Sequence, residues 1–118
     1  MVTKKNTFQR KESVTIQDLS HAQARLVRLM QQMNFGTIHG LHVRDGQPVF
    51  DPAPEVEREV KLGSGEGPRP ELEGPNFTLK REVVEMFERM ESMADGVIPT
   101  IKVKHGLPFM MTIRERVN

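Results

Sequence analysis

The chain contains no Cys, no Trp and no Tyr, and aromatic residues make up 5% of its 118 positions. The lack of Cys excludes disulfides and thiol chemistry and fits a reducing compartment, so we expect a cytoplasmic protein. Scarce aromatics and a formal net charge of +1 argue against nucleic-acid binding by stacking and by charge. No apolar run approaches the length of a membrane span, so no membrane partner is expected.

What the chain does contain is an internal repeat with a period of sixty residues. The segment from Leu19 to Phe50 aligns without a gap with residues 79–110. The repeated residues are apolar, Gly or Pro: Leu19 and Leu79, Met30 and Met90, Met33 and Met93, Gly36 and Gly96, Ile38 and Ile98, Val43 and Val103, Gly46 and Gly106, Pro48 and Pro108. Such positions determine a fold rather than a reaction, so the repeat predicts two units of one architecture.

Each unit is predicted to begin with a helix. Apolar residues recur at helical spacing from near Asp18 to Gly36 and again over Leu79–Ala94. Asp18 and its counterpart Thr78 are expected to cap the two helices. Gly36 and Gly96 are expected to end them.

A β-hairpin is predicted after each helix. Asp45-Gly46 is a strong two-residue turn signal, and His105-Gly106 takes its place in the second unit. Such turns fix the register and place these residues opposite each other: Val43 and Pro48, Leu41 and Phe50, Val103 and Pro108, Ile101 and Met110. The apolar positions before each turn are spaced three and then two apart, which predicts β-bulges at His39-Gly40 and Pro99-Thr100.

A further strand is predicted over Val56–Leu62, with a shorter counterpart over Ile113–Val117. Asp51–Pro54 has the character of an insertion in the first unit. The expected organisation is a basic tail at 1–14, an αβββ unit at 15–62, a Gly/Pro linker at 63–76 and an αββ(β) unit at 77–118. The predicted class is α+β, a tandem helix–hairpin–strand repeat packed as one domain, with a mostly antiparallel sheet and both helices on one face.

The first unit, "LVRLMQQMNFGTIHGLHVRDGQPVF", resembles the YezD-like proteins, a family of small bacterial domains of unknown function. The resemblance covers about a third of the chain and is carried by Phe35, Gly36, Thr37, Ile38, Val43, Asp45 and Gly46. In the second unit Ala94-Asp95-Gly96 replaces the aromatic-Gly pair. The resemblance implies a bacterial protein with a short helix and a hairpin, and it implies no activity or site.

No residue pattern in the chain predicts catalysis, a metal site or a cofactor. The histidines show no ligand spacing: His21, His39, His42 and His105. Three carboxylates at alternate positions, Glu55, Glu57 and Glu59, are interpreted as a solvated edge that discourages aggregation, with cation or basic-peptide binding as the alternative. Nucleophile-elbow and phosphate-loop motifs are missing.

The clearest functional signal is the apolar run from Leu107 to Ile113. With Pro108 and Met110 directed at the helices, large apolar side chains remain on the opposite, uncovered face of the sheet: Val49, Leu107, Phe109, Met111 and Ile113. Such side chains left in water are unusual for a monomer. We therefore predict a non-enzymatic interaction or oligomerisation module, most simply a homodimer formed through this face.

Two alternatives remain at the level of sequence. A nucleic-acid or ribosome-associated protein would use the N-terminal tail and a basic sheet face made of His42, Arg44, Lys102, Lys104, Arg114 and Arg116. This alternative is not favoured because of the small net charge. The third interpretation is an enzyme or small-ligand binder with a pocket between the helices and the sheet.

Overall fold

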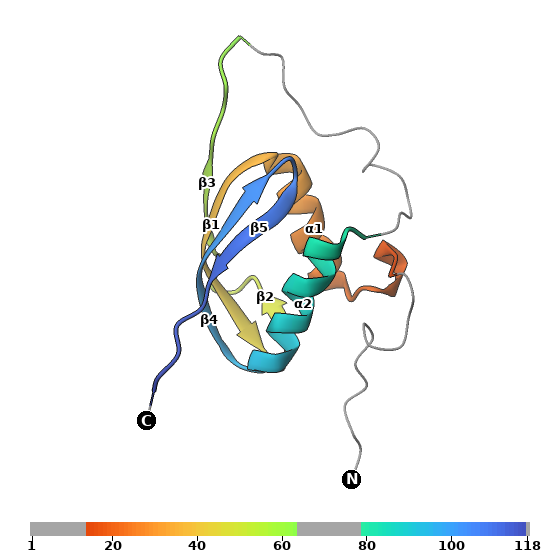
Figure 1. Ribbon diagram of the computed structural model, residues 1–118, viewed down its shortest axis with the longest axis vertical. Coiled ribbons are helices and arrows are strands. Elements are labelled where there is room, and N and C mark those ends of the chain that lie inside the picture. The colour runs from red at the N-terminus through yellow and green to blue at the C-terminus, as the bar shows by residue number, and fades with distance from the viewer. Residues whose placement is uncertain (1–13, 64–78, 118) are drawn as a thin grey trace.

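The structure, a computed structural model, describes residues 14–63 and 79–117. In these ranges the chain has an α+β fold in which two helices lie on one face of an antiparallel sheet of five strands (Figure 1). The elements are a 3-10 helix η1 (Ile16–Asp18), α1 (His21–Met33), β1 (Phe35–Arg44), β2 (Gln47–Val49), β3 (Glu55–Arg58), α2 (Arg81–Met93), β4 (Gly96–Lys104) and β5 (Leu107–Thr112).

The long strands β1 and β4 form the centre of the sheet. They pair antiparallel, with Ile38 opposite Ile101 and Leu41 opposite Ile98. On the far side of β1 lie both β2 and β3, each beside a different half of that strand. On the far side of β4 lies β5 alone. The outer edges of the sheet are therefore an interrupted edge made of β2 and β3 and a continuous edge made of β5.

The prediction that Asp18 caps the first helix is wrong. Asp18 ends η1, where its carboxylate accepts a hydrogen bond from the Thr15 amide at 2.9 Å. The cap is Ser20, whose hydroxyl oxygen accepts from the Gln23 amide at 3.1 Å while the Gln23 side chain accepts from the Ser20 amide at 2.9 Å. This reciprocal capping box satisfies two amides that the first turn leaves free, so α1 begins two residues later than a cap at Asp18 would place it.

The second helix also begins later than predicted, at Arg81. Leu79 lies before the helix, is buried, and donates its amide to the Val14 carbonyl at 2.7 Å. The N-cap is Lys80, which makes no side-chain capping bond. Thr78, the expected cap, lies outside the described residues.

The helices end through Asn34 and Ala94 rather than through Gly36 and Gly96. Asn34 has a φ of 64° and Ala94 a φ of 61°, and each donates its amide back to the last turn of its helix. The two glycines lie inside β1 and β4. The predicted ends were displaced because Asn and Ala accept positive φ here, which leaves the glycines free for the strands.

Both hairpin turns are confirmed. Asp45 and Gly46 have φ values of 53° and 77°, and His105 and Gly106 have values of 55° and 76°. Positive φ at both central residues is the geometry of a two-residue turn that matches strand twist. The turns place Val43 opposite Pro48 and Val103 opposite Pro108, as predicted.

Beyond the turns the predicted register fails. In the second hairpin Lys102 pairs with Met110 and Ile101 with Met111, because the register shifts between Lys102 and Val103 and Phe109 becomes the additional residue of a bulge. In the first hairpin β2 ends at Val49, so Leu41 and Phe50 do not pair as predicted. The shift at Phe109 exchanges the faces of Met110 and Met111, since side chains alternate along a strand.

The irregularity expected near Gly40 takes a different form. His39 pairs with Thr100 and Leu41 with Ile98. Between these two pairs lies one unpaired residue on each strand, Gly40 and Pro99, so neither strand has an additional residue there. The bulges were predicted so that the apolar residues of each strand share one face. Four of these residues are completely buried: Ile38, Leu41, Ile98 and Ile101.

The predicted strand over Ile113–Val117 is wrong, since these residues have no regular structure. In the first unit two short strands, β2 and β3, follow β1, because the Asp51–Pro54 segment leaves the sheet between them. In the second unit β5 runs without interruption to Thr112. Residues 1–13 and 64–76, which are most of the predicted tail and of the predicted linker, lie outside the described residues. Val14, the last residue of the predicted tail, is buried in the core, so its assignment to the tail is wrong.

One core joins the two helices to the sheet. It contains buried residues from both units: Val14, Ile16, Leu26, Val27, Met30, Met33, Ile38, Leu41, Val43, Leu79, Val83, Met86, Phe87, Met90, Ile98, Ile101 and Val103. The units also exchange hydrogen bonds at positions sixty residues apart. The Gly46 amide donates to the Ala94 carbonyl at 2.7 Å, and the Gly106 amide donates to the Asn34 carbonyl at 2.9 Å.

Candidate functional site

The sheet face turned away from the helices is of mixed character and not the apolar patch that was expected. His39 and Glu57 contact each other there at 2.8 Å, and the Thr100 and Thr112 hydroxyls share a hydrogen bond of 2.9 Å. Val97 is an exposed apolar residue among them, opposite His42 in the register. Polar side chains that satisfy one another give this face little reason to bind an apolar partner.

The five residues of the predicted interface do not form one surface. Leu107 and Met111 are half-buried against the core, so the prediction that they point away from the helices is wrong. Phe109, Met111 and Ile113 come together at the β5 edge, beside α2. Val49 lies on β2, at the other edge of the sheet. The bulge at Phe109 causes the difference, because it turns Met111 inward and leaves Met110 exposed.

A groove lies between β5 and α2, and we call it the β5 groove. Its volume is about 360 Å³, and its lining residues are Pro108, Phe109, Met110, Met111 and Ile113 with Glu82, Glu85, Met86 and Arg89 from the helix. Two of them are unusually exposed for their size: Phe109 is 54% accessible and Met110 55%. A bulged aromatic residue next to an exposed Met is therefore the strongest apolar feature at the β5 edge.

The edge of β5 itself has no strand neighbour in the part of the chain that the structure describes. Every residue from Leu107 to Ile113 is uncharged. The opposite edge is different, because β3 is a short strand that carries Glu55, Glu57 and Arg58. Charges on a short edge strand discourage pairing with another chain. Pro108 and the bulge hinder pairing of another strand with the first part of β5, whereas residues 110–113 contain neither a proline nor a bulge.

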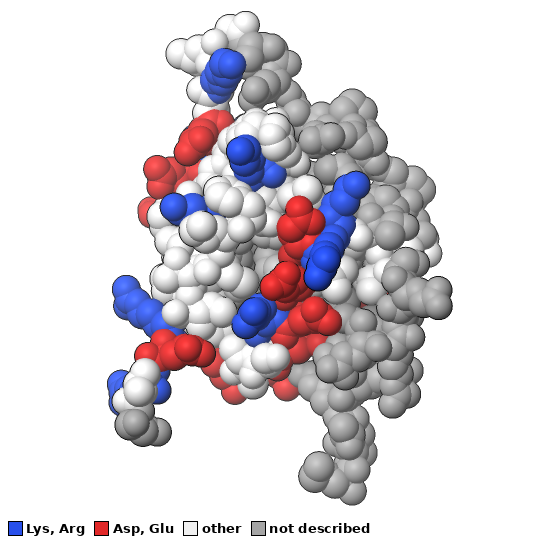
Figure 2. Space-filling view, viewed as in Figure 1, with Lys and Arg blue, Asp and Glu red and all other residues white. Residues whose placement is uncertain are grey.

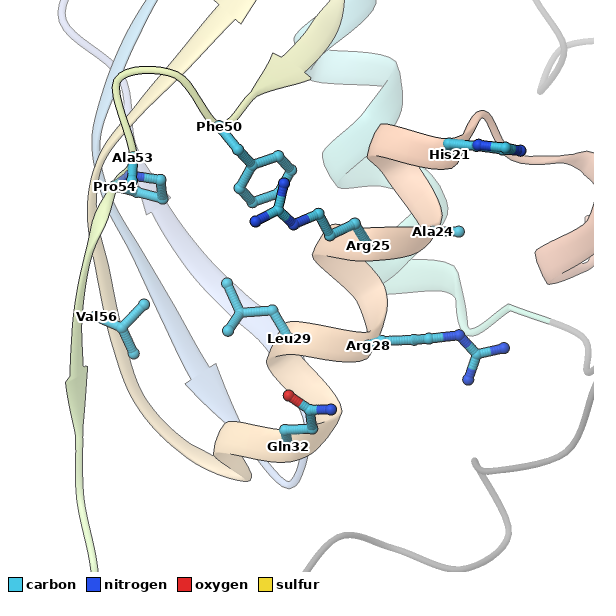
Figure 3. Close-up of a pocket in the computed structure, with 10 residues that line it drawn as sticks. All are labelled: His21, Ala24, Arg25, Arg28, Leu29, Gln32, Phe50, Ala53, Pro54 and Val56. Carbon is cyan, nitrogen blue, oxygen red and sulfur yellow. The ribbon is translucent and has the colours of Figure 1, made fainter.

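A second groove of about 700 Å³, the α1 groove, lies between α1 and the chain from Phe50 to Val56. The Arg25 guanidinium lies over the Phe50 ring, 4.3 Å from its centre, as Figure 3 shows. Val56 pairs with the buried Ile38, yet Val56 is 38% exposed because the α1 groove lies between it and α1. With its apolar floor and an arginine at its rim, this groove has the chemistry to accept an anion with an apolar body.

Sequence reasoning missed the α1 groove. The signal that could have found it was the Asp51–Pro54 insertion, which interrupts the edge of the sheet and holds β3 away from α1 (Figure 3). In the second unit the continuous β5 leaves a smaller groove against its helix.

The predicted basic face is not one surface. Arg44 ends β1 and Lys104 ends β4, and the two strands are antiparallel, so these residues lie at opposite ends of the sheet. Nine residues of strand separate them, or about 30 Å at 3.3 Å per residue. Lys102 lies between them, and His42 is half-buried. Arg114 and Arg116 follow β5 in the exposed segment 113–117.

Within the described ranges, no three His, Asp or Glu side chains form a group that could hold a metal ion. The four histidines come from three places: His21 is on α1, His39 and His42 are three residues apart on β1, and His105 is in a turn beside the Phe35 ring. The same ranges contain no helix long and apolar enough to cross a membrane.

Comparison with known proteins yields no family for this chain: no family model matches it, and no curated protein or solved structure does.

Proposed function

We propose that this protein is a small non-enzymatic protein–protein interaction module that binds its partner through the β5 edge and the β5 groove. The observation that carries the proposal is the exposure of Phe109 and Met110, each more than half accessible, beside an uncharged strand edge that has no strand neighbour among the described residues. An exposed, uncharged edge strand is a template for pairing with another chain.

The chemistry of such an edge defines how a partner would bind. An extended strand would add to β5 through main-chain hydrogen bonds, and its alternate side chains would enter the β5 groove. Phe109 would supply the aromatic anchor that dominates the energy of many interfaces. Glu82 and Glu85, at the rim of the groove, would select basic groups in the partner.

The proposal includes an internal duplication in a cytoplasmic bacterial protein. Two features support the duplication. Both helices have thirteen residues and begin sixty positions apart. The hydrogen bonds of Gly46 to Ala94 and of Gly106 to Asn34 are also related by sixty positions. Contacts of residue i with j and of j with i are what the fusion of a two-fold symmetric dimer would leave behind.

Site-specific photo-crosslinking in the native cell tests the proposed function. A photoreactive phenylalanine analogue replaces Phe109 in one variant and Val97 in the control, because Val97 is 43% exposed on the other face of the sheet. We expect a protein adduct from position 109 that is at least about tenfold more abundant than from position 97, since central apolar anchors dominate binding. The absence of a protein adduct at position 109, or equal yields at both positions, would refute the proposal.

A further inference from the structure

This inference rests on the proposed function and names its partner. We propose that the occupant of the β5 groove is a second copy of this chain, whose β5 strand pairs antiparallel with the first across a two-fold axis. The dimer would join the two sheets edge to edge, and each copy would cover Phe109 and Met110 of the other.

The edges of the sheet favour this pairing over other contacts between copies. An antiparallel pair of identical strands is self-complementary and closes at two subunits. The interrupted edge offers only three residues of β2, including Pro48, and the four residues of β3, three of them charged. The β5 edge is uncharged throughout, and its second half, from Met110 to Thr112, contains neither proline nor bulge, so this half is the edge that a second copy can extend.

The register of the pairing determines where the chain leads after β5. If Met111 lies opposite Met111 of the second copy, each pair of facing residues has numbers that sum to 222. Arg114 of the second copy then reaches the level of Pro108, and Arg116 the level of Gly106, at the start of β5. This end of β5 lies beside the first turns of α2, while the C-terminal segment leaves from the other end (Figure 1).

Opposite charges are available at these two places. The first turns of α2 carry Glu82 and Glu85, both exposed and both lining the β5 groove, next to the exposed Arg81. The segment after β5 carries Arg114 and Arg116 with Glu115 between them, all three exposed. Figure 2 shows acidic side chains interleaved with basic ones over α2 and a separate group of both signs at the C-terminal segment, with uncharged surface between them over β5. The two-fold axis makes the attraction reciprocal, because each copy supplies both partners.

Within one copy Glu85 has a weak partner. Its carboxylate lies 3.8 Å from the Arg89 guanidinium, and both side chains are largely exposed. An exposed pair of this kind contributes little to stability, so Glu85 remains available to an arginine of a second copy.

Sedimentation equilibrium of the full chain tests this inference by charge reversal. We expect the wild-type protein to dimerise at micromolar concentration. Arg114→Glu with Arg116→Glu makes both sites acidic, and Glu82→Arg with Glu85→Arg makes both sites basic. Each double variant should dimerise at least about tenfold more weakly, because four attractive pairs become repulsive. An equimolar mixture of the two variants should recover the wild-type affinity, since each copy then meets the opposite charge.

The control is Arg28→Glu with Arg44→Glu, which changes the net charge by the same amount as Arg114→Glu with Arg116→Glu, at exposed positions away from β5. This control should leave the dimer affinity unchanged.

A wild-type monomer at high micromolar concentration overturns the inference, and so does a mixture that dimerises as weakly as its components. If a monomer accompanies an adduct from position 109 to a different protein, the proposed function stands and the second copy is excluded. If position 109 gives no adduct either, both fall.

Discussion

Gly36 and Gly96 have the same backbone conformation at the start of β1 and β4, with φ values of 156° and 157°, yet their surroundings differ. A Cβ on Gly36 would overlap the Glu57 carbonyl oxygen and lie 3.1 Å from the Arg58 Cα. A Cβ on Gly96 would meet only the flexible end of Met93, at 3.1 Å. The difference exists because Gly36 lies between two strands, β3 and β4, whereas in the described ranges Gly96 pairs with β1 alone.

We therefore expect Gly36→Ala to lower the free energy of unfolding by about 3 kcal/mol, and Gly96→Ala by about 1–2 kcal/mol from backbone strain alone. Urea denaturation followed by circular dichroism measures both. The matched φ of the two sites makes Gly96→Ala the control for strain. If both variants lost the same free energy of unfolding, the overlap of the new Cβ with β3 would not contribute to the destabilisation of Gly36→Ala.

The two helices have equal length but unequal N-termini. α1 begins with the Ser20–Gln23 capping box, while Lys80 at the start of α2 makes no side-chain hydrogen bond. A serine at position 80 would offer an oxygen to the amides of the first turn. We expect Lys80→Ser to raise the free energy of unfolding by about 0.5–1 kcal/mol, and Ser20→Ala to lower it by about 1 kcal/mol.

Lys80→Ala separates capping from the loss of a charge, because Ala is as poor a cap as Lys. Chemical denaturation of the three variants gives the comparison. If Lys80→Ala stabilises the protein as much as Lys80→Ser, the gain comes from removing the positive charge near the helix N-terminus, and the capping argument is wrong.

The same scale shows what could be predicted from the sequence. Helices, turns and the pairs nearest each turn followed from apolar spacing and from Asp45-Gly46, because these signals are local. The bulge at Phe109 was not predictable, since it depends on how β5 lies against β4 and α2. That one residue exchanged the faces of Met110 and Met111. In Leu107–Ile113 the prediction therefore holds for the buried Pro108 and the exposed Phe109, but it places Met110 and Met111 on the wrong faces.

The whole molecule is held together by contacts between its halves. The central pairing of β1 with β4 joins the first unit to the second, and the core draws on both helices. Val27 and Phe87, sixty positions apart, are 2% and 0% exposed in that one core. Neither unit covers its own sheet completely, so the loss of packing in one unit must weaken the other.

We expect Val27→Ala and Phe87→Leu each to lower the free energy of unfolding by about 1–2.5 kcal/mol, according to the volume removed from the core. In each variant the amide resonances of α1 and α2 should lose intensity at one shared urea concentration, because a single cooperative transition unfolds both units. The exposed Val60→Ala serves as control and should leave the midpoint unchanged. The opposite result would be that α1 in the Phe87→Leu variant keeps the wild-type midpoint while α2 unfolds at a lower urea concentration. The halves would then be independent folding units, and the β1–β4 pairing would be a contact between two domains rather than the centre of one.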